Sequence, residues 1–290
     1  MIITRRNGTL FLIDQHEHAR LAGDLCDRWG NERFDAPRPA AAMRLASDLH
    51  DEGWRQLDGE PRFNGQAARP MHFLEIGQDE HVAIYGDGVE AAGRHDPYAG
   101  LLVSMHWTGL YRARWGLQSG GVFIAEDSPV AQLQNDTVEA EERRWIELKR
   151  ALVQGRRRSD FEIGLWHNYE LLQTYDVMSL YVCTAPLEPS TNGAEPTQVV
   201  STLKSIDQEP GPRTIETVPC RPAGERVDIL LTATAPGVVI VDPYPFDEDG
   251  VRVELSGRVI PDRRYGSAAE VAAATATSAT QKIECEFRRA

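Results

Sequence analysis

Hydrophobic and polar positions along the first 185 residues mostly follow a helical period. A short apolar segment at 2–13 comes first, and its Asn7-Gly8 pair is a strong signal for the turn of a β-hairpin. Beyond this hairpin, apolar residues recur three and four positions apart, which predicts amphipathic helices. We expect these helices over residues 14–29, 39–51, 79–92, 96–115, 137–154 and 159–183.

The pattern changes near residue 185. The stretch APLEPSTNGAEPT has the composition of a linker or a long loop. Beyond it the pattern predicts strands over 227–234, 238–241 and 251–259, a short helix from Ser267, and a last strand over 282–287. The predicted fold class is therefore mostly α. A helical domain over 1–185 is followed by a smaller β-rich region over 186–290, which is expected to pack on the helical body.

Several ionisable side chains interrupt the apolar faces of the predicted helices. They are His18, the His50-Asp51 pair, His106 and Asp176. His18, His106 and Asp176 each lie where the helical period places a core residue, and the His50-Asp51 pair lies in the last turn of a fourth helix. A buried charge is costly unless another group pairs with it. For any one histidine, a hydrogen-bonded position in the core is a sufficient explanation. For Asp176, an ion pair with Arg112 or Arg114 is another.

The occurrence of these groups together on four predicted helices favours one shared partner, a bound metal ion. Imidazole nitrogens and carboxylate oxygens without a thiolate suit iron, manganese, zinc or nickel, and the sequence does not choose among these metals. We therefore expect one or two divalent ions as the cofactor.

The same residues resemble the ligand set of the HD-domain superfamily, which consists of helical metal-dependent phosphohydrolases with a His…His-Asp…Asp pattern. Several segments are also similar to an uncharacterised bacterial HD-like family, over nearly the whole chain. They are QHEHARLAGDL, DLHDEGW, DPYAGLLVSMHWTGLY, LLQTYDVMSLYVC and DPYPFD. The resemblance implies an HD-like helical bundle. It also implies a metal ligand set of His18, His50, Asp51 and Asp176.

Binuclear members of that superfamily add two histidines, for which His81 and His106 fit best in this chain. Asp51 would then bridge the two ions. His72 and His95 are alternatives to His81. Many members carry a lysine in a pattern like HDxGK, whereas this chain has HDEGW.

Composition limits the partners. The net charge of −13 argues against nucleic acid and against an anionic membrane surface as partners, because both would repel the protein.

Neither an export signal nor an apolar run of membrane-spanning length is evident, so a cytoplasmic protein is expected. Two of the four cysteines, Cys26 and Cys183, fall within apolar helices and are expected to be buried thiols. The expected partner is a small-molecule substrate. The sequence does not decide whether the protein forms a homo-oligomer.

The function predicted from these features is a metal-dependent phosphohydrolase that acts on a small phosphorylated metabolite or nucleotide. Asp51 would be a ligand of the metal ion that activates water, and His81 or Glu52 would relay protons. One alternative is an HD-type diiron oxygenase, which the fuller histidine set and the missing lysine favour. The other is a non-catalytic regulatory module in which the metal is structural.

Overall fold

An antiparallel hairpin opens the chain, as the sequence predicts. In the computed structural model, which describes residues 1–117, 123–185, 198–201 and 211–290, strands β1 (Ile2–Arg6) and β2 (Thr9–Ile13) are paired. The two residues between them, Asn7 and Gly8, have φ angles of 47° and 76°. Positive φ at both positions is what a two-residue hairpin turn requires.

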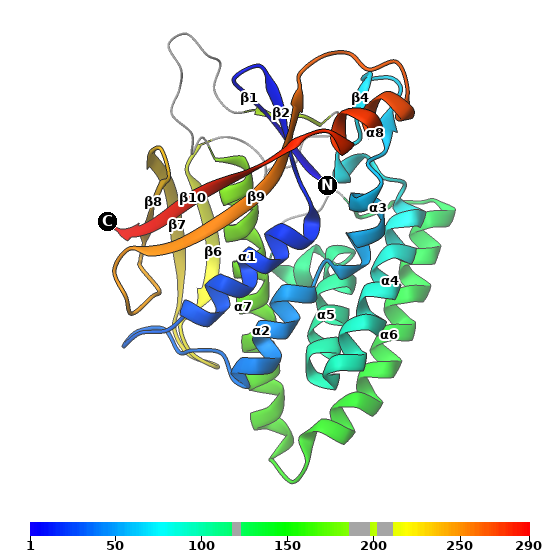
Figure 1. Ribbon diagram of the computed structural model, residues 1–290. Coiled ribbons are helices and arrows are strands. Elements are labelled where there is room, and N and C mark those ends of the chain that lie inside the picture. The colour runs from blue at the N-terminus through cyan, green and yellow to red at the C-terminus, as the bar shows by residue number, and fades with distance from the viewer. Residues whose placement is uncertain (118–122, 186–197, 202–210) are drawn as a thin grey trace.

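Among the described residues, seven α-helices lie between the hairpin and β5 (Gln198–Val199) (Figure 1). They are α1 (Gln15–Arg28), α2 (Ala40–Leu49), α3 (Arg55–Gly59), α4 (Gln78–His95), α5 (Pro97–Leu110), α6 (Pro129–Val153) and α7 (Arg158–Thr184). All except α3 overlap a predicted helix. Helix α6 begins eight residues earlier than expected, because the Ser128 side chain accepts a hydrogen bond from the Ala131 amide and Pro129 occupies the first turn.

Shorter elements connect these helices. Three are 3₁₀ turns: η1 (Glu52–Trp54), η2 (Phe73–Glu75) and η3 (Ala113–Gly116). Strands β3 (Phe63–Asn64) and β4 (Arg69–Pro70) form a two-residue ladder of their own, in the segment between the predicted helices over 39–51 and 79–92.

The strands of the second half join one large sheet. They are β5 (Gln198–Val199), β6 (Arg213–Pro219), β7 (Arg226–Ala235), β8 (Val238–Asp242), β9 (Val251–Pro261) and β10 (Ala279–Arg289). A short helix, α8 (Ala268–Ala276), precedes β10. The eight-stranded sheet has the order β5-β1-β2-β9-β10-β8-β7-β6, and its neighbours are antiparallel except for the parallel pair β10 and β8.

The predicted fold class, a mostly α HD-like bundle with a smaller β-rich region after it, is wrong. The chain has a mixed α/β fold in which the N-terminal hairpin lies inside the sheet of the C-terminal strands (Figure 1). Strand β2 pairs with β9, so that Leu10 lies opposite Ile260 and Phe11 opposite Val259. A two-stranded hairpin is marginally stable at best on its own, and here β5 and β9 cover its two edges.

One apolar core connects the helices with the sheet. The Trp29 ring at the end of α1 lies 5.2 Å from the ring of Tyr175 on α7 and 5.9 Å from that of Phe246, before β9. Helices α1 and α7 both contact strands of the sheet. The boundary proposed between 1–185 and 186–290 and most of the predicted linker fall on residues 186–197, outside the described residues.

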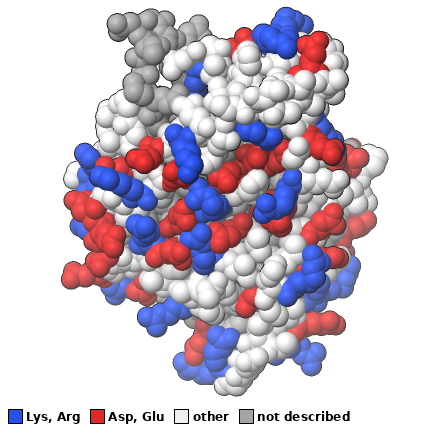
Figure 2. Space-filling view, in the orientation of Figure 1, with Lys and Arg blue, Asp and Glu red and all other residues white. Residues whose placement is uncertain are grey.

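Charged side chains of both signs are interspersed on the face that carries α1, α2 and β9 (Figure 2). Many form ion pairs, such as Arg20 with Asp24 and Arg44 with Asp48, each at 2.7 Å. Within the described ranges, no helix is both long and apolar enough to cross a lipid bilayer. All four cysteines are buried free thiols, which confirms the prediction for Cys26 and Cys183.

Candidate metal centre

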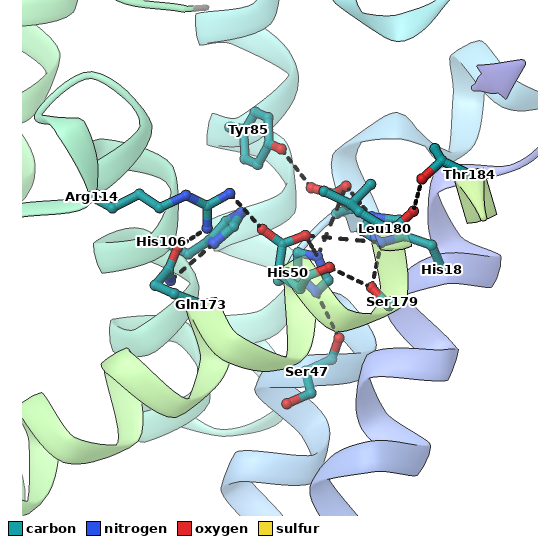
Figure 3. Close-up of polar contacts among 12 residues, drawn as sticks. His18, Ser47, His50, Tyr85, His106, Arg114, Gln173, Ser179, Leu180 and Thr184 are labelled. Carbon is teal, nitrogen blue, oxygen red and sulfur yellow. Dashed lines mark hydrogen bonds and ion pairs between the residues drawn. The ribbon is translucent and has the colours of Figure 1, made fainter. Parts of the chain in front are cut away.

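Five of the predicted residues meet in the interior, between α1, the end of α2, α5 and α7 (Figure 3). They are His18, His50, Asp51, His106 and Asp176, and their exposed fractions lie between 1% and 4%. Their donor atoms form two overlapping groups, His18–His50–Asp51 and His50–His106–Asp176. Within each group the atoms lie within 4.8 Å of one another. These buried groups can hold a metal ion.

Hydrogen bonds to one nitrogen orient the rings of His50 and His18. His50 Nδ1 donates to the carbonyl oxygen of Ser47 at 2.8 Å. His18 Nδ1 lies 2.9 Å from Ser179 Oγ, and this hydroxyl donates its own proton to the carbonyl of Asp176. We therefore assign His18 Nδ1 as the donor in that contact. In both rings Nε2 is left to face the carboxylates, as in metal-binding histidines held by a hydrogen bond at the other nitrogen.

Asp51 divides its two oxygens between a tyrosine and the histidines. The Tyr85 hydroxyl donates to Oδ1 at 2.5 Å. Oδ2 lies 2.8 Å from His18 Nε2 and 4.0 Å from His50 Nε2. The tyrosine thus fixes the carboxylate so that one oxygen points at both imidazoles.

Asp176 is held in the same way, by an arginine. Arg114 Nη2 lies 2.9 Å from Asp176 Oδ2, and Asp176 Oδ1 lies 3.6 Å from His50 Nε2. Arg114 is the ion-pair partner that the sequence offered as one explanation for this aspartate. Arg112 instead donates to Asn135. The ion pair engages one carboxylate oxygen and leaves the other beside His50.

The charges and distances of the cluster fit a bound cation. Two carboxylates and one guanidinium sum to one negative charge, which a protonated His50 balances when no metal ion is bound. Burial lowers the pKa of His50, but the charges of Asp51 and Asp176 outweigh it and raise this pKa to about 9. His50 Nε2 is buried and has no hydrogen-bond partner among the described residues. Its separations of 3.6 and 4.0 Å from the two carboxylates approach the roughly 3.4 Å between two ligands on one tetrahedral metal ion.

Metal binding at this cluster is expected to release a proton at neutral pH. Because the pKa of His50 is raised to about 9, its imidazole keeps a proton at pH 7 that a cation must displace. The apparent affinity should then rise about tenfold per pH unit from about pH 7 to pH 9 and level off above it. Titration calorimetry in buffers of different ionisation enthalpy measures the released proton. An affinity that does not change over this range would contradict the prediction.

His106 is oriented differently from the other two histidines. Arg114 Nη1 donates to Gln173 Oε1, so the Gln173 amide nitrogen is turned to His106 Nδ1, at 3.2 Å. Burial and then the charge of His50 lower the pKa of His106 to about 3, so the ring is neutral at pH 7. With Nδ1 accepting, the single proton of His106 lies on Nε2. This arrangement suits a hydrogen-bond donor, whereas His18 and His50 are already oriented as ligands.

His81 lies apart from these donor groups. Its Nδ1 is 2.8 Å from the Tyr111 hydroxyl, and its ring stacks on Phe123 with centroids 3.8 Å apart. Neither metal-ligand group found among the described residues includes it. Burial lowers the pKa of His81 to about 3. Its Nε2 is buried without a hydrogen-bond partner among the described residues, but His81 is outside both groups, so the structure does not join it to the five clustered residues.

The remaining candidates also lie outside the two donor groups. Both oxygens of Glu52 accept hydrogen bonds from Arg55, at 2.8 Å. His72 Nδ1 accepts from the Leu74 amide and caps η2. His95 is exposed in the last turn of α4.

The sequence indicated Arg114 as a partner of Asp176, but not the side chains that orient His18, His50 and Asp51. Ser47 and Ser179 lie three residues from His50 and from Asp176, one helical turn away, which is the only local signal for them. Tyr85 lies one turn beyond His81 on α4. Its contact with Asp51 joins two elements that the helical period does not relate.

Comparison with known families corrects the resemblance to the HD-domain superfamily. The family model that matches, over residues 1–262, is described as a protein of unknown function (DUF3891), and no finding supports an HD-domain relationship. Neither the curated proteins nor the solved structures gave a match. The matched range includes all five clustered residues and the chain through the end of β9. The chain therefore belongs to the DUF3891 family, whose function is unknown.

Proposed function

We propose that this protein is a metal-dependent hydrolase of a small phosphorylated compound. A divalent ion would bind to His18, His50, Asp51 and Asp176. The observation that supports this most is the orientation of the two imidazoles. Both have Nδ1 engaged by a fixed oxygen and Nε2 turned to carboxylates, in an interior where each of the four residues is at most 4% exposed.

A divalent ion bound there would lower the pKa of a water molecule and polarise a phosphoryl oxygen. In the reaction, the oxygen of water would bond to phosphorus and the bond from phosphorus to the ester oxygen would break. One proton of the water would pass to the ester oxygen, so that the products are an alcohol and inorganic phosphate. Tyr85 and Arg114 keep the two carboxylates in place during this step. His106 presents an N–H donor beside His50 and Asp176, where it can stabilise negative charge.

A site for one ion agrees better with the contacts than a site for two. His81 belongs to neither donor group, and His106 has its proton on the nitrogen that a metal would need. The chemistry of the site therefore depends on the His18–His50–Asp51 group and its neighbour Asp176.

Elemental analysis of gently purified protein, beside the His106→Ala variant, tests this proposal. We expect one divalent ion per chain in both proteins, and hydrolysis of phosphate esters by the native protein that chelation abolishes. Two iron ions that fall to one in His106→Ala, with oxygen consumption, would favour the diiron oxygenase. A bound ion without hydrolysis of a broad ester panel would favour the regulatory module. Protein without stoichiometric metal would refute the proposal.

A further inference from the structure

Helix α6 has an uncovered face beside the turn that leads into α7. The two helices diverge from this turn, and a groove of about 430 Å³ lies between them (Figure 1). Its apolar lining comes from α6, and charged side chains of both helices surround it. We call the lining residues of this helix the α6 face. They are Glu142, Trp145, Ile146, Lys149, Arg150 and Val153.

Ile146, in the middle of the α6 face, is the most exposed large apolar side chain among the described residues, at 61%. One exposed apolar residue alone needs no explanation, but Ile146 lies next to an apolar groove with a fixed floor. The Trp145 ring is only 6% exposed, and its Nε1 donates a hydrogen bond to Ser104 Oγ of α5 at 2.6 Å. A cavity of about 150 Å³ holds a benzene molecule, so this groove has room for an isoleucine side chain of another molecule.

Two charged side chains flank Ile146 at equal distances along the helix. Glu142 precedes it by four residues and Arg150 follows it by four, so the three side chains form one row on the helix surface. Neither Glu142 nor Arg150 has an ion-pair or hydrogen-bond partner for its side chain among the described residues. Lys149, by contrast, is paired with Glu162 of α7 at 3.0 Å. The row therefore carries one unpaired negative charge and one unpaired positive charge.

This row is complementary to itself. A two-fold axis beside Ile146 places Ile146 next to its own copy, Glu142 opposite Arg150 of the second copy, and Arg150 opposite the Glu142 of that copy. Rows of residues four apart that pack against each other are the commonest contact between helices. Arg143 and Lys149 also approach each other across this axis, but each has a carboxylate partner in its own chain, at 3.6 and 3.0 Å. No unpaired like charges therefore meet in this arrangement.

The charges of the row favour a second copy over other partners. A partner that carries charges of only one sign, such as nucleic acid, would match one end of the row and repel the other. The net charge of −13 opposes the association of two copies. Charges more than about 8 Å apart are largely screened at physiological ionic strength, however, so the contacts at the α6 face decide the outcome.

We propose that the α6 face is the contact surface of a symmetric homodimer, with Ile146 at the two-fold axis and Glu142 paired with Arg150 of the second copy. Specific interfaces usually bury about 1,600 Å² in total, and one face of a single helix provides less. The dimer is therefore weak and reversible, with a Kd in the range of about 1–100 µM. The proposal does not depend on the function of the metal centre.

Sedimentation equilibrium over about 1–200 µM protein measures the Kd of this dimer. Ile146→Asp places two carboxylates at the axis, and Leu133→Asp is its matched control. Leu133 is 40% exposed on the same helix, but it precedes Ile146 by roughly three and a half turns and so lies on the opposite side. Glu142→Arg and Arg150→Glu each reverse one charge of the row. Circular dichroism verifies that every variant is folded.

We expect the native protein and Leu133→Asp to dimerise with the same Kd. Ile146→Asp should raise the Kd at least about thirtyfold, because it brings two like charges together without a partner. Glu142→Arg and Arg150→Glu should each raise it about tenfold or more, because the symmetry repeats each like-charge contact. An equimolar mixture of these two charge-reversed chains should form a heterodimer with nearly the native Kd, since both contacts then join an arginine to a glutamate.

Three results would overturn the proposal. The first is native protein that remains monomeric at about 200 µM. The second is a dimer that Ile146→Asp leaves intact, which would place the interface elsewhere. The third is a native dimer whose two charge-reversed chains do not associate when mixed, because Glu142 and Arg150 would then not meet across the axis.

Discussion

His50→Ala protein is expected to purify without its metal ion and to lose more than about a hundredfold of its hydrolytic rate. His50 belongs to both donor groups, and its Nε2 lies 3.6 Å from Asp176 and 4.0 Å from Asp51. Changes to residues that merely orient metal ligands already cost about 10–100-fold in metal affinity or activity, and removing a ligand should cost more. Elemental analysis and the rate of phosphate release measure the two effects.

His95→Ala is the matched control for this variant. His95 is exposed at the end of α4 and was one of the alternative ligands in the sequence. The same change of residue type there should leave metal content and rate unchanged. Full metal occupancy in His50→Ala, or metal loss in His95→Ala, would place the site elsewhere.

Asp176→Ala is expected to lower the free energy of unfolding of the metal-free protein by about 3–5 kcal/mol. The substitution leaves the Arg114 guanidinium, in a residue only 7% exposed, without the carboxylate that lies 2.9 Å from it. Urea unfolding in EDTA measures this effect separately from any metal contribution. Asp79→Ala, at an exposed position of α4, is the control and should stay within about 0.5 kcal/mol of the native protein.

The double variant Arg114→Met, Asp176→Leu separates the two roles of the aspartate. Replacing both members of a buried ion pair by apolar residues is often neutral for stability, so most of the loss in Asp176→Ala should be recovered. Metal binding should not be recovered, because the carboxylate is still absent. If Asp176→Ala and the native protein have the same free energy of unfolding in EDTA, the ion pair contributes nothing to the stability of the fold.

The pH dependence of this ion pair follows from its charges. Burial raises the pKa of Asp176, but Arg114 and then His50 outweigh it and hold this pKa well below its ordinary value. A carboxyl with a lowered pKa stabilises the fold above the pKa of the unfolded chain, about 3.9, and this contribution is lost as the pH falls below it. The recovery in the double variant is therefore best measured near pH 7.

Local signals in the sequence were sufficient for most of the helices and for the inward direction of the polar residues. Asn7-Gly8 placed the hairpin turn, and Asp96, where a predicted helix begins, caps α5 by accepting hydrogen bonds from the amides of Tyr98 and Ala99. His18 and Asp176 are buried because the helical period of their neighbours determines which side of each helix faces the core. These properties depend on residues within one or two turns of each other, so a single segment determines them.

Contacts between distant segments decided the rest. The pairing of β2 with β9 joins residues about 250 positions apart. The alternation of apolar and polar residues in each strand is the same whether or not the two strands pair, so it cannot reveal this pairing. The four-residue ligand order resembled the HD-domain pattern, but order along the chain does not determine the fold around it. The choice of Arg114 over Arg112, the proton positions on His18 and His106, and the separation of His81 from the cluster all follow from packing between elements. The sequence alone thus determined which side chains turn inward, and the tertiary structure decided which of them meet, because convergence requires several helices to pack at once.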